Sequence, residues 1–202
     1  ARKSRGLGDV YKRQNLVFSS GGATERLRID SSGRLLKGLT SARGNYGNNT
    51  SGVEHIFQIE GTSAINSTLA IVRNSNDAND GGIVLGKTRS TSNGGNTVVQ
   101  AGDDLGNLTF AGNDGSTMLF GAEIFAEVQS GVGNDDMPAD LIFKTNGGST
   151  STAERLRITS GGQVNIGASS QTTHMLYLQG AGDVGIHIRA DSDNSGENDN
   201  PY

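Results

Sequence analysis

Residues 15–38 read NLVFSSGGATERLRIDSSGRLLKG, and residues 140–167 read DLIFKTNGGSTSTAERLRITSGGQVNIG. The pentapeptide ERLRI at residues 25–29 recurs unchanged at residues 154–158. A hydrophobic triplet precedes each copy, and a turn containing Ser-Gly follows it. A unit that recurs along one chain is typical of elongated proteins in which each unit contacts its neighbours. The recurrence therefore predicts an extended repeat protein.

The similarity continues beyond these two stretches. Residues 55–61 (HIFQIEG) resemble residues 174–180 (HMLYLQG), and residues 71–73 resemble residues 187–189. The chain has no initiator Met, so we expect it to be a fragment with both ends cut. The correspondences predict three parts: the end of a preceding β module (15–38), a complete β repeat module (39–167), and the truncated start of the next module (168–202).

The first 14 residues, ARKSRGLGDVYKRQ, differ from the rest in composition. They hold five basic residues against one acidic residue, whereas the remainder holds 12 basic and 20 acidic residues. The string resembles a translated sequencing adapter at the end of a metagenomic gene fragment. The alternative is a basic arm for nucleic acid or membrane. We exclude residues 1–14 from fold prediction, and the acidic remainder disfavours nucleic-acid binding through phosphate neutralisation.

The composition restricts the kind of core that the chain can build. Of 202 residues, 31 are Gly, 2 are Pro and none is Cys, and only 33% are hydrophobic. Glycine buries almost no side-chain area, so thin layers or a core shared between chains suit this composition. Without Cys there are no disulfides and no thiolate metal ligands. No run approaches the roughly 18 apolar residues of a membrane span, so no membrane insertion is expected.

Alternation of apolar and polar residues predicts an all-β fold. In residues 119–128, LFGAEIFAEV, alternation places Ala122, Ile124, Ala126 and Val128 on one face and Glu123, Phe125 and Glu127 on the other. Gly, Asn and Asp separate the apolar runs every 8–15 residues or so, which is typical of turns between short strands. Besides the ERLRI copies and 163–166, the candidate strands are 53–59, 67–73, 82–86, 96–100, 105–111, 119–128, 139–145, 174–178 and 184–189.

This pattern is compatible with several elongated β architectures. Tandem modules of this kind can form a β-sandwich, a β-prism or a β-helix-like stack. Open sheet edges are a liability in a long repetitive protein. Winding three chains together would close those edges and supply the core that one glycine-rich chain lacks. We therefore expect a homotrimer.

Candidate catalytic residues are few. The three histidines are His55, His174 and His187; His55 and His174 occupy equivalent repeat positions, which favours a structural role. Glu123 and Glu127 share a strand face, but four residues of strand separate them by about 13 Å. Paired glycosidase carboxyls sit roughly 5–9.5 Å apart, so these two predict a solvated outer face. A further acidic group, which sequence alone leaves open, is Asp135, Asp136 and Asp140.

Two stretches superficially resemble ligand-binding loops. Residues 74–82 (NSNDANDGG) are acidic, but a calcium loop begun at Asn76 would place Ala78 and Lys87 at ligand positions. Ordinary Asx turns explain them better. Residues 81–88 (GGIVLGKT) lack the spacing of a phosphate-binding loop. The repeated arginines, for which glycan binding is the alternative to pairing with carboxylates on their own strand face, are Arg26, Arg28, Arg155 and Arg157. We predict no catalytic, cofactor-binding or metal-binding residue and no cofactor.

The residues ERLRIDSSGRLLKG and ERLRITSGGQVNIG resemble the modules of bacteriophage tail fibres and related virion structural proteins. The blocks 102–115, 121–128 and 134–148 are similar to the body of the same module. In that family, such modules often precede a C-terminal self-cleaving chaperone domain that helps the fibre trimerise. The Leu-Leu-Lys-Gly at 35–38 departs from the usual Val-x-Ile-Gly ending, which makes the first copy a divergent one.

The resemblance implies a non-enzymatic tail-fibre segment located in the virion. Its expected partners are further copies of itself, other tail proteins and a host-surface glycan, contacted through loops such as 41–52 and 74–82. Two alternatives stay open: a bacterial surface adhesin or stalk, which would be extracellular or on the cell surface, and a glycan-depolymerising tailspike.

Overall fold

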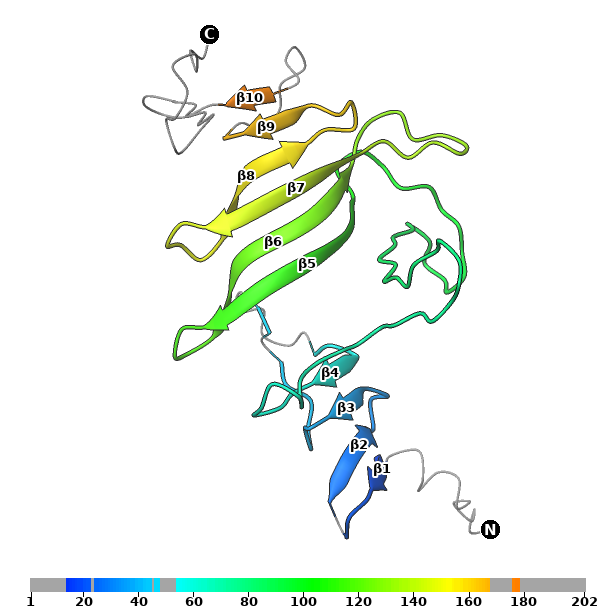
Figure 1. Cartoon of the computed structure of the whole chain (residues 1–202), viewed down its shortest axis with the longest axis vertical. Coiled ribbons are helices and arrows are strands. Elements are labelled where there is room, and N and C mark those ends of the chain that lie inside the picture. Colours follow the sequence, from blue (N-terminus) through cyan, green and yellow to red (C-terminus); the bar gives the residue numbers. More distant parts are fainter. Residues whose placement is uncertain (1–13, 23, 45, 48–53, 168–175, 179–202) are drawn as a thin grey trace, which may run out of the picture.

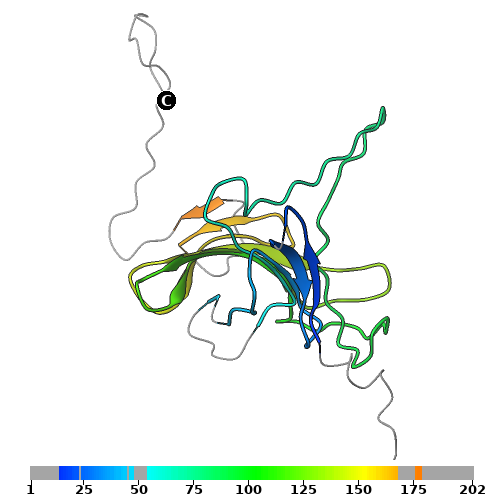
Figure 2. The same cartoon turned by 90° about the horizontal axis from the view of Figure 1, so that it is seen from below.

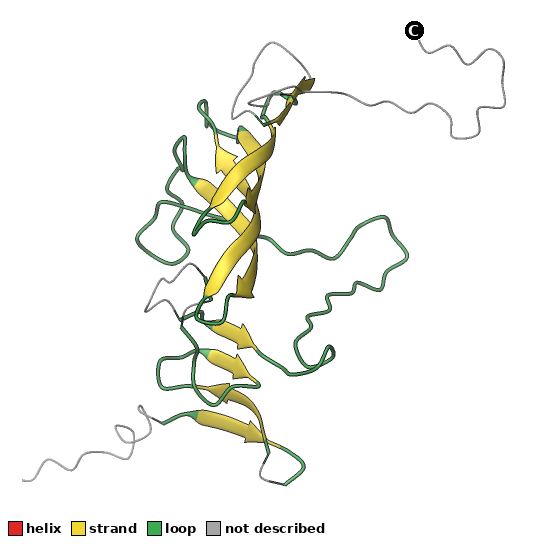
Figure 3. Cartoon of the chain, turned by 90° about the vertical axis from the view of Figure 1, so that its left-hand side faces the viewer, coloured by secondary structure: helices red, strands yellow, loops and turns green. Residues whose placement is uncertain are grey.

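The computed structural model describes residues 14–22, 24–44, 46–47, 54–167 and 176–178. The predicted all-β class is confirmed, because these residues form ten strands and no helix (Figure 3). It follows that none of them belongs to a helix able to cross a bilayer. The strands are β1 (Leu16–Ser19), β2 (Glu25–Ile29), β3 (Leu35–Lys37), β4 (Phe57–Ile59), β5 (Asp104–Asn113), β6 (Met118–Val128), β7 (Ala139–Asn146), β8 (Thr152–Ile158), β9 (Val164–Ile166) and β10 (Leu176–Leu178).

The strands form two sheets whose order follows the chain. The first sheet has the order β1-β2-β3-β4, and the second has the order β10-β9-β8-β7-β6-β5. Figure 1 shows the strands stacked along the long axis, with β1 and β10 at opposite ends. The result is an elongated ladder of strands, in agreement with the predicted elongated architecture.

The two ERLRI stretches adopt the same strand pairing. Phe18 pairs with Leu27 in the first sheet, and Phe143 pairs with Leu156 in the second. In both copies the register then shifts by one residue, so that the first Arg of ERLRI has no partner in the ladder. A β-bulge of this kind adds one residue to one strand and bends it locally. The identical pentapeptide therefore has the same irregularity at both places.

The correspondence extends to the next two strands. β2 and β8 each turn back into a short antiparallel strand, β3 or β9, which then pairs in parallel with β4 or β10. Gly33 and Gly162 occupy equivalent places in these turns, with φ values of 81° and 82°. Residues with a side chain rarely adopt such positive φ values, so glycine is required at both positions.

The interior of the single chain is small. Its only buried hydrophobic residues among those described are Leu36, Val99, Phe125, Val128 and Ile142. Twenty large hydrophobic residues are exposed. Scattered exposed apolar residues are ordinary, but an excess of this size indicates surfaces that another molecule covers.

Three strand predictions were wrong for the isolated chain. Residues 67–73, 82–86 and 96–100 form no strand and lie in the long connection between β4 and β5. The strand predicted at 53–59 is shorter, because only residues 57–59 find a neighbouring strand. An apolar run becomes a strand only where a partner backbone lies alongside it.

Several predictions fall outside the described residues. They include most of the leader (1–14), the strand at 184–189 and, apart from β10, the start of the next module (168–202).

Candidate functional site

The main candidate site is one face of the second sheet. Successive side chains on a strand point to opposite faces, and residues directly opposite each other in neighbouring strands share a face. One side of the sheet is apolar in all six strands, and we call it the apolar face. It comprises Leu108, Phe110, Ala122, Ile124, Ala126, Leu141, Phe143, Leu156, Ile158, Val164, Ile166, Leu176 and Leu178.

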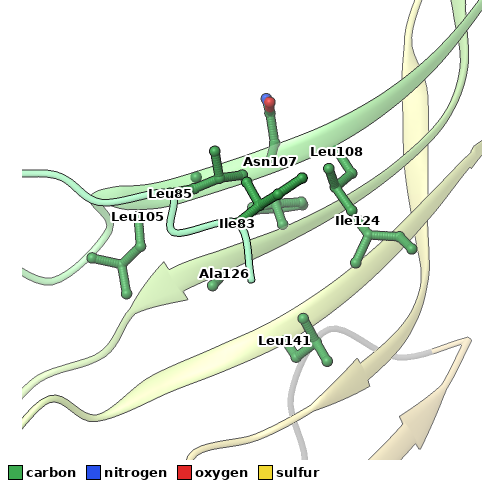
Figure 4. Close-up of a pocket in the computed structure, with 10 residues that line it drawn as sticks. Ile83, Leu85, Leu105, Asn107, Leu108, Ile124, Ala126 and Leu141 are labelled. Carbon is green, nitrogen blue, oxygen red and sulfur yellow. The ribbon is translucent and has the colours of Figure 1, made fainter. Parts of the chain in front are cut away.

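The apolar face is largely open to solvent. Leu108 and Phe110 of β5 are 53% and 58% exposed, and Leu141, Ile158 and Ile166 are also exposed. Ile83 and Leu85 of the β4–β5 connection lie over part of it and, with residues of β5, β6 and β7, line a hollow of about 290 Å³ (Figure 4). Val128 at the end of β6, on the same side, is fully buried, so the face is open mainly along β5 and at the exposed residues of β7 to β10.

The opposite face, which we call the polar face, is the better buried one. Ile142 of β7 and Asn165 of β9 are fully buried on it. Long charged side chains cover the apolar residues there; the ammonium of Lys144 lies 4.2 Å from the centre of the Phe125 ring. Lys and Arg bury their hydrocarbon stems in this way while the charged end keeps polar partners. The sheet therefore buries its polar face and exposes its apolar face.

An ionic cluster around Arg157 holds the polar face together. Its guanidinium donates to Asp140 at 2.6 Å, to both carboxylate oxygens of Glu154 at 2.9 and 2.8 Å, and to Glu127 at 3.3 Å. Asp140 also accepts a hydrogen bond from the backbone N–H of Ser160 at 2.7 Å. The hydrogen bonds that Arg157 donates to Glu154 and Asp140 raise its pKa further above its ordinary value. The cluster joins β6, β7 and β8.

The first sheet has a simpler version of this cluster. Arg28 pairs with both carboxylate oxygens of Glu25 at 2.7 and 2.6 Å. Pairing of the repeated arginines with carboxylates on their strand face is thus confirmed for Arg28 and Arg157. It was wrong for Arg26 and Arg155, which donate to the hydroxyls of Ser20 and Thr145. The bulge explains the difference, because these two arginines are the residues that it removes from the ladder.

The two glutamates considered as a catalytic pair have structural partners. Glu127 belongs to the Arg157 cluster, and Glu123 accepts a hydrogen bond from Thr152. Both are half-buried, so the expectation of a solvated outer face was wrong. The reason is that they lie on the polar face, which the long side chains cover.

The remaining candidates are dispersed. His55 packs edge-on against Tyr46, with ring centroids 5.3 Å apart, and His174 and His187 lie outside the described residues. Burial and a hydrogen bond to Glu60 raise the pKa of Tyr46. Asp135 and Asp136 are exposed in the β6–β7 connection, whereas Asp140 is buried in the Arg157 cluster.

The acidic stretch at 74–82 forms the Asx turn that the sequence predicts. The carboxylate of Asp77 accepts hydrogen bonds from Ser75, from the backbone and side chain of Asn79, and from Arg73. Within the described part of the chain, no three His, Asp or Glu side chains are placed to hold a metal ion. No helix follows the glycine-rich residues 81–88, so the arrangement of a phosphate-binding loop is missing there.

Sequence inspection did not identify the apolar face as a whole. Alternation within residues 119–128 correctly placed Ala122, Ile124, Ala126 and Val128 together. The other strands contribute to the same face only through their register, and no single strand contains that information.

Comparison with known proteins gives a structural similarity only. No family model and no curated protein matches the chain. Among solved structures, the carboxy-terminal domain of the bacteriophage T5 L-shaped tail fibre is similar, with a TM-score of 0.54 and 14% identity over 88% of this chain and 72% of that chain. The same tail-fibre domain with its intramolecular chaperone domain gives a TM-score of 0.42 and 15% identity over 89% of this chain and 55% of that chain. The chain is therefore similar in fold to a domain of a phage tail fibre.

Proposed function

We propose that this chain is a structural segment of a bacteriophage tail fibre and that it assembles as a homotrimer through its apolar face. One observation carries the proposal: a six-stranded sheet exposes a face on which every strand places apolar residues. A sheet with one apolar face must bury that face against another layer. Fully burying a Leu, Ile or Phe side chain contributes about 1.5–3 kcal/mol, so covering this face would be strongly favourable.

Three copies around a common axis would satisfy this requirement for each of them. Each apolar face would turn inward, and the ladder of strands would continue along the axis. The elongated stack in Figure 1 supports this arrangement, because β1 and β10 lie at its opposite ends and neighbouring modules can join there. Similarity in fold to the phage T5 tail-fibre domain supports the same conclusion.

The fibre segment would act mechanically and by adhesion, as part of a virion. Polar side chains at residues 74–80, on the tip of the β4–β5 connection, are exposed and suited to contact a host-surface glycan. We propose the same contact for the loop at 41–52, of which residues 45 and 48–52 lie outside the described residues. Other tail proteins would contact the ends of the segment, and we propose no catalysed reaction.

The assembly proposal is tested by placing a charge on the apolar face. Leu141→Asp puts a carboxylate in the middle of that face, between β6 and β8. Ser149→Asp, in the exposed β7–β8 turn, is the matched control. Light scattering should give a trimer for the unmodified chain and for Ser149→Asp, and dissociation for Leu141→Asp. A Leu141→Asp trimer as stable as the control would contradict the proposal.

The adhesive role is tested on an array of bacterial surface polysaccharides. We expect binding by the unmodified chain and loss of binding when residues 74–80 are replaced by a Gly-Ser linker. New reducing ends released from any bound polysaccharide would contradict the proposed absence of catalysis and favour a depolymerising tailspike.

A further inference from the structure

We propose that the connection between β4 and β5 is an exchanged arm, whose extended segments pair with the free edge of β5 in a second copy of the chain. We define the arm as residues 67–88 and its two legs as residues 67–73 and 81–87. The inference rests on the proposed trimer and goes beyond it, because it assigns an interchain contact separate from the apolar face.

The sequence of the legs is that of buried strands. Residues 69–72 read LAIV and residues 83–85 read IVL. Continuous apolar runs of this length, bounded by turn residues, are typical of strands buried on both faces. The sequence predicts strands at 67–73 and 82–86, and in the single chain these residues join no sheet.

In the single chain the legs are exposed and unpaired. All residues of the arm are exposed, and Val72 and Val84 are 75% and 94% exposed. No backbone–backbone hydrogen bond joins residues 67–87 to any described residue. Figure 2 shows the tip of the arm extending away from the strands of its own chain, whereas Leu85 of the second leg lies against Gly106 of β5. Exposed apolar side chains are stabilised by burial, and unpaired backbone groups by hydrogen bonds. The edge strand of a sheet can supply both kinds of contact.

The arm is nevertheless a built structure, held at its tip and at its base. At the tip, Asp77 binds Arg73 at 2.6 Å and closes the turn. Gly81 lies beside the first leg, since a Cβ added there would be 3.6 Å from a methyl group of Ile71. At the base, the guanidinium of Arg89 forms two hydrogen bonds of 2.7 Å with Asp103. The tip and the base of the arm are thus fixed, while the residues of both legs stay exposed.

The direction in which the arm leaves the sheet is also set by packing. Leu85 lies against Gly106 of β5 so closely that a Cβ on that glycine would be 2.5 Å from the Cβ of Leu85. This contact places the second leg over the apolar face (Figure 4). In the proposed trimer a second copy lies on that side, so the arm projects toward it.

The edge of β5 is the best recipient among the described strand edges. β5 ends the second sheet and has ten residues, whereas β1, β4 and β10 have four or fewer. Its outer backbone groups have no strand beside them, and Leu108 and Phe110 are exposed there. A long apolar edge strand left open would promote aggregation. If a leg of seven residues lay beside β5, the backbone groups of the leg and those of the β5 edge would form hydrogen bonds with each other.

Cross-linking between introduced cysteines tests the proposal. The chain has no cysteine, so Val84→Cys with Thr109→Cys leaves one thiol on the arm and one on β5. A short bis-maleimide cross-linker can join the two thiols even when residues 84 and 109 are not directly opposite each other in the paired strands. We expect covalent dimers and trimers on a denaturing gel. Val84→Cys with Ser149→Cys, whose second thiol lies in the distant β7–β8 turn, should stay monomeric, as should both single variants.

Light scattering on the same samples separates the two proposals. A trimer that yields only cross-links within one chain, or none, would overturn the exchanged arm and leave the trimer intact. A monomer would overturn the proposed assembly as well.

Amide hydrogen exchange gives a second readout without substitutions. In the trimer, amides of residues 67–73 and 81–87 should exchange far more slowly than those of the exposed turn at 130–135. Equal, fast exchange in both segments would also overturn the exchanged arm.

Discussion

At the residue scale, the two sheets differ at one buried position. Asn165 of β9 is fully buried beside Arg157, and neither its side-chain oxygen nor its nitrogen has a hydrogen-bond partner in the described part of the chain. Leu36 occupies the equivalent position in β3, beside Arg28, and is also fully buried. A buried amide without partners costs about 1–3 kcal/mol. The first sheet avoids this cost.

Exchanging these side chains should therefore shift stability in opposite directions. Asn165→Leu is expected to raise the free energy of unfolding by about 1–3 kcal/mol, because it removes an unsatisfied buried amide. Leu36→Asn should lower it by a similar amount or more. Urea denaturation measures both. A loss of stability in Asn165→Leu would show that the amide has a partner outside the described residues.

A second residue, Asp103, predicts a pH dependence. The hydrogen bond from Arg89 and that from the backbone N–H of Gln100 hold the pKa of Asp103 well below its ordinary value of 3.8. A carboxylate whose folded pKa is lowered stabilises the fold above its unfolded pKa, and this contribution is lost as pH falls toward the folded value.

Asp103→Asn should therefore flatten the acid side of the stability profile. The thermal unfolding temperature of the unmodified chain should fall as the pH is lowered from about 4 to about 2. The unfolding temperature of Asp103→Asn should fall less over that interval. Asp135→Asn, in the exposed β6–β7 turn, is the control and should follow the unmodified chain. Parallel profiles for Asp103→Asn and the unmodified chain would contradict the assignment.

At the element scale, the Arg157 cluster adds side-chain contacts to the backbone ladder between three strands. Glu127 comes from β6, Asp140 from β7, and Glu154 and Arg157 from β8. The side chain of Arg157 is only 11% exposed, so water has little access to its charge. Removing one partner of a buried ion pair leaves the other charges uncompensated.

Arg157→Gln is thus expected to lower the free energy of unfolding by about 3 kcal/mol or more. Arg155→Gln is the matched control: its side chain is exposed and donates to Thr145, so the change should stay within about 0.5 kcal/mol. Chemical denaturation of both variants measures the difference. Equal effects would mean that the cluster adds no stability beyond an ordinary surface contact.

The elements differ in how well the sequence predicts them. β5 to β9 follow one another directly, three of their four connections being short turns, so alternation and turn residues locate them closely. The legs of the arm have an equally clear apolar pattern, but the pattern does not say which backbone lies alongside. For the same reason the sequence suggested that Arg157 pairs with carboxylates but not that Asp140 is one of them, because register between distant strands decides that contact.

At the scale of the whole molecule, the chain is a ladder whose apolar side faces outward. Among the described residues, twenty exposed large hydrophobic side chains against five buried ones make an incomplete core for a solitary protein. The composition predicted this in outline, since a chain with 31 glycines and 33% hydrophobic residues suits a core shared between copies. Which residues form the shared core could be read only from the assembled sheet.

The molar mass of the unmodified chain in solution tests this account most directly. Multi-angle light scattering on the 202-residue chain should give three times the mass of one chain across a range of concentrations. A single-chain mass, together with a cooperative thermal unfolding transition, would mean that the apolar face is stable without a cover and would contradict the account.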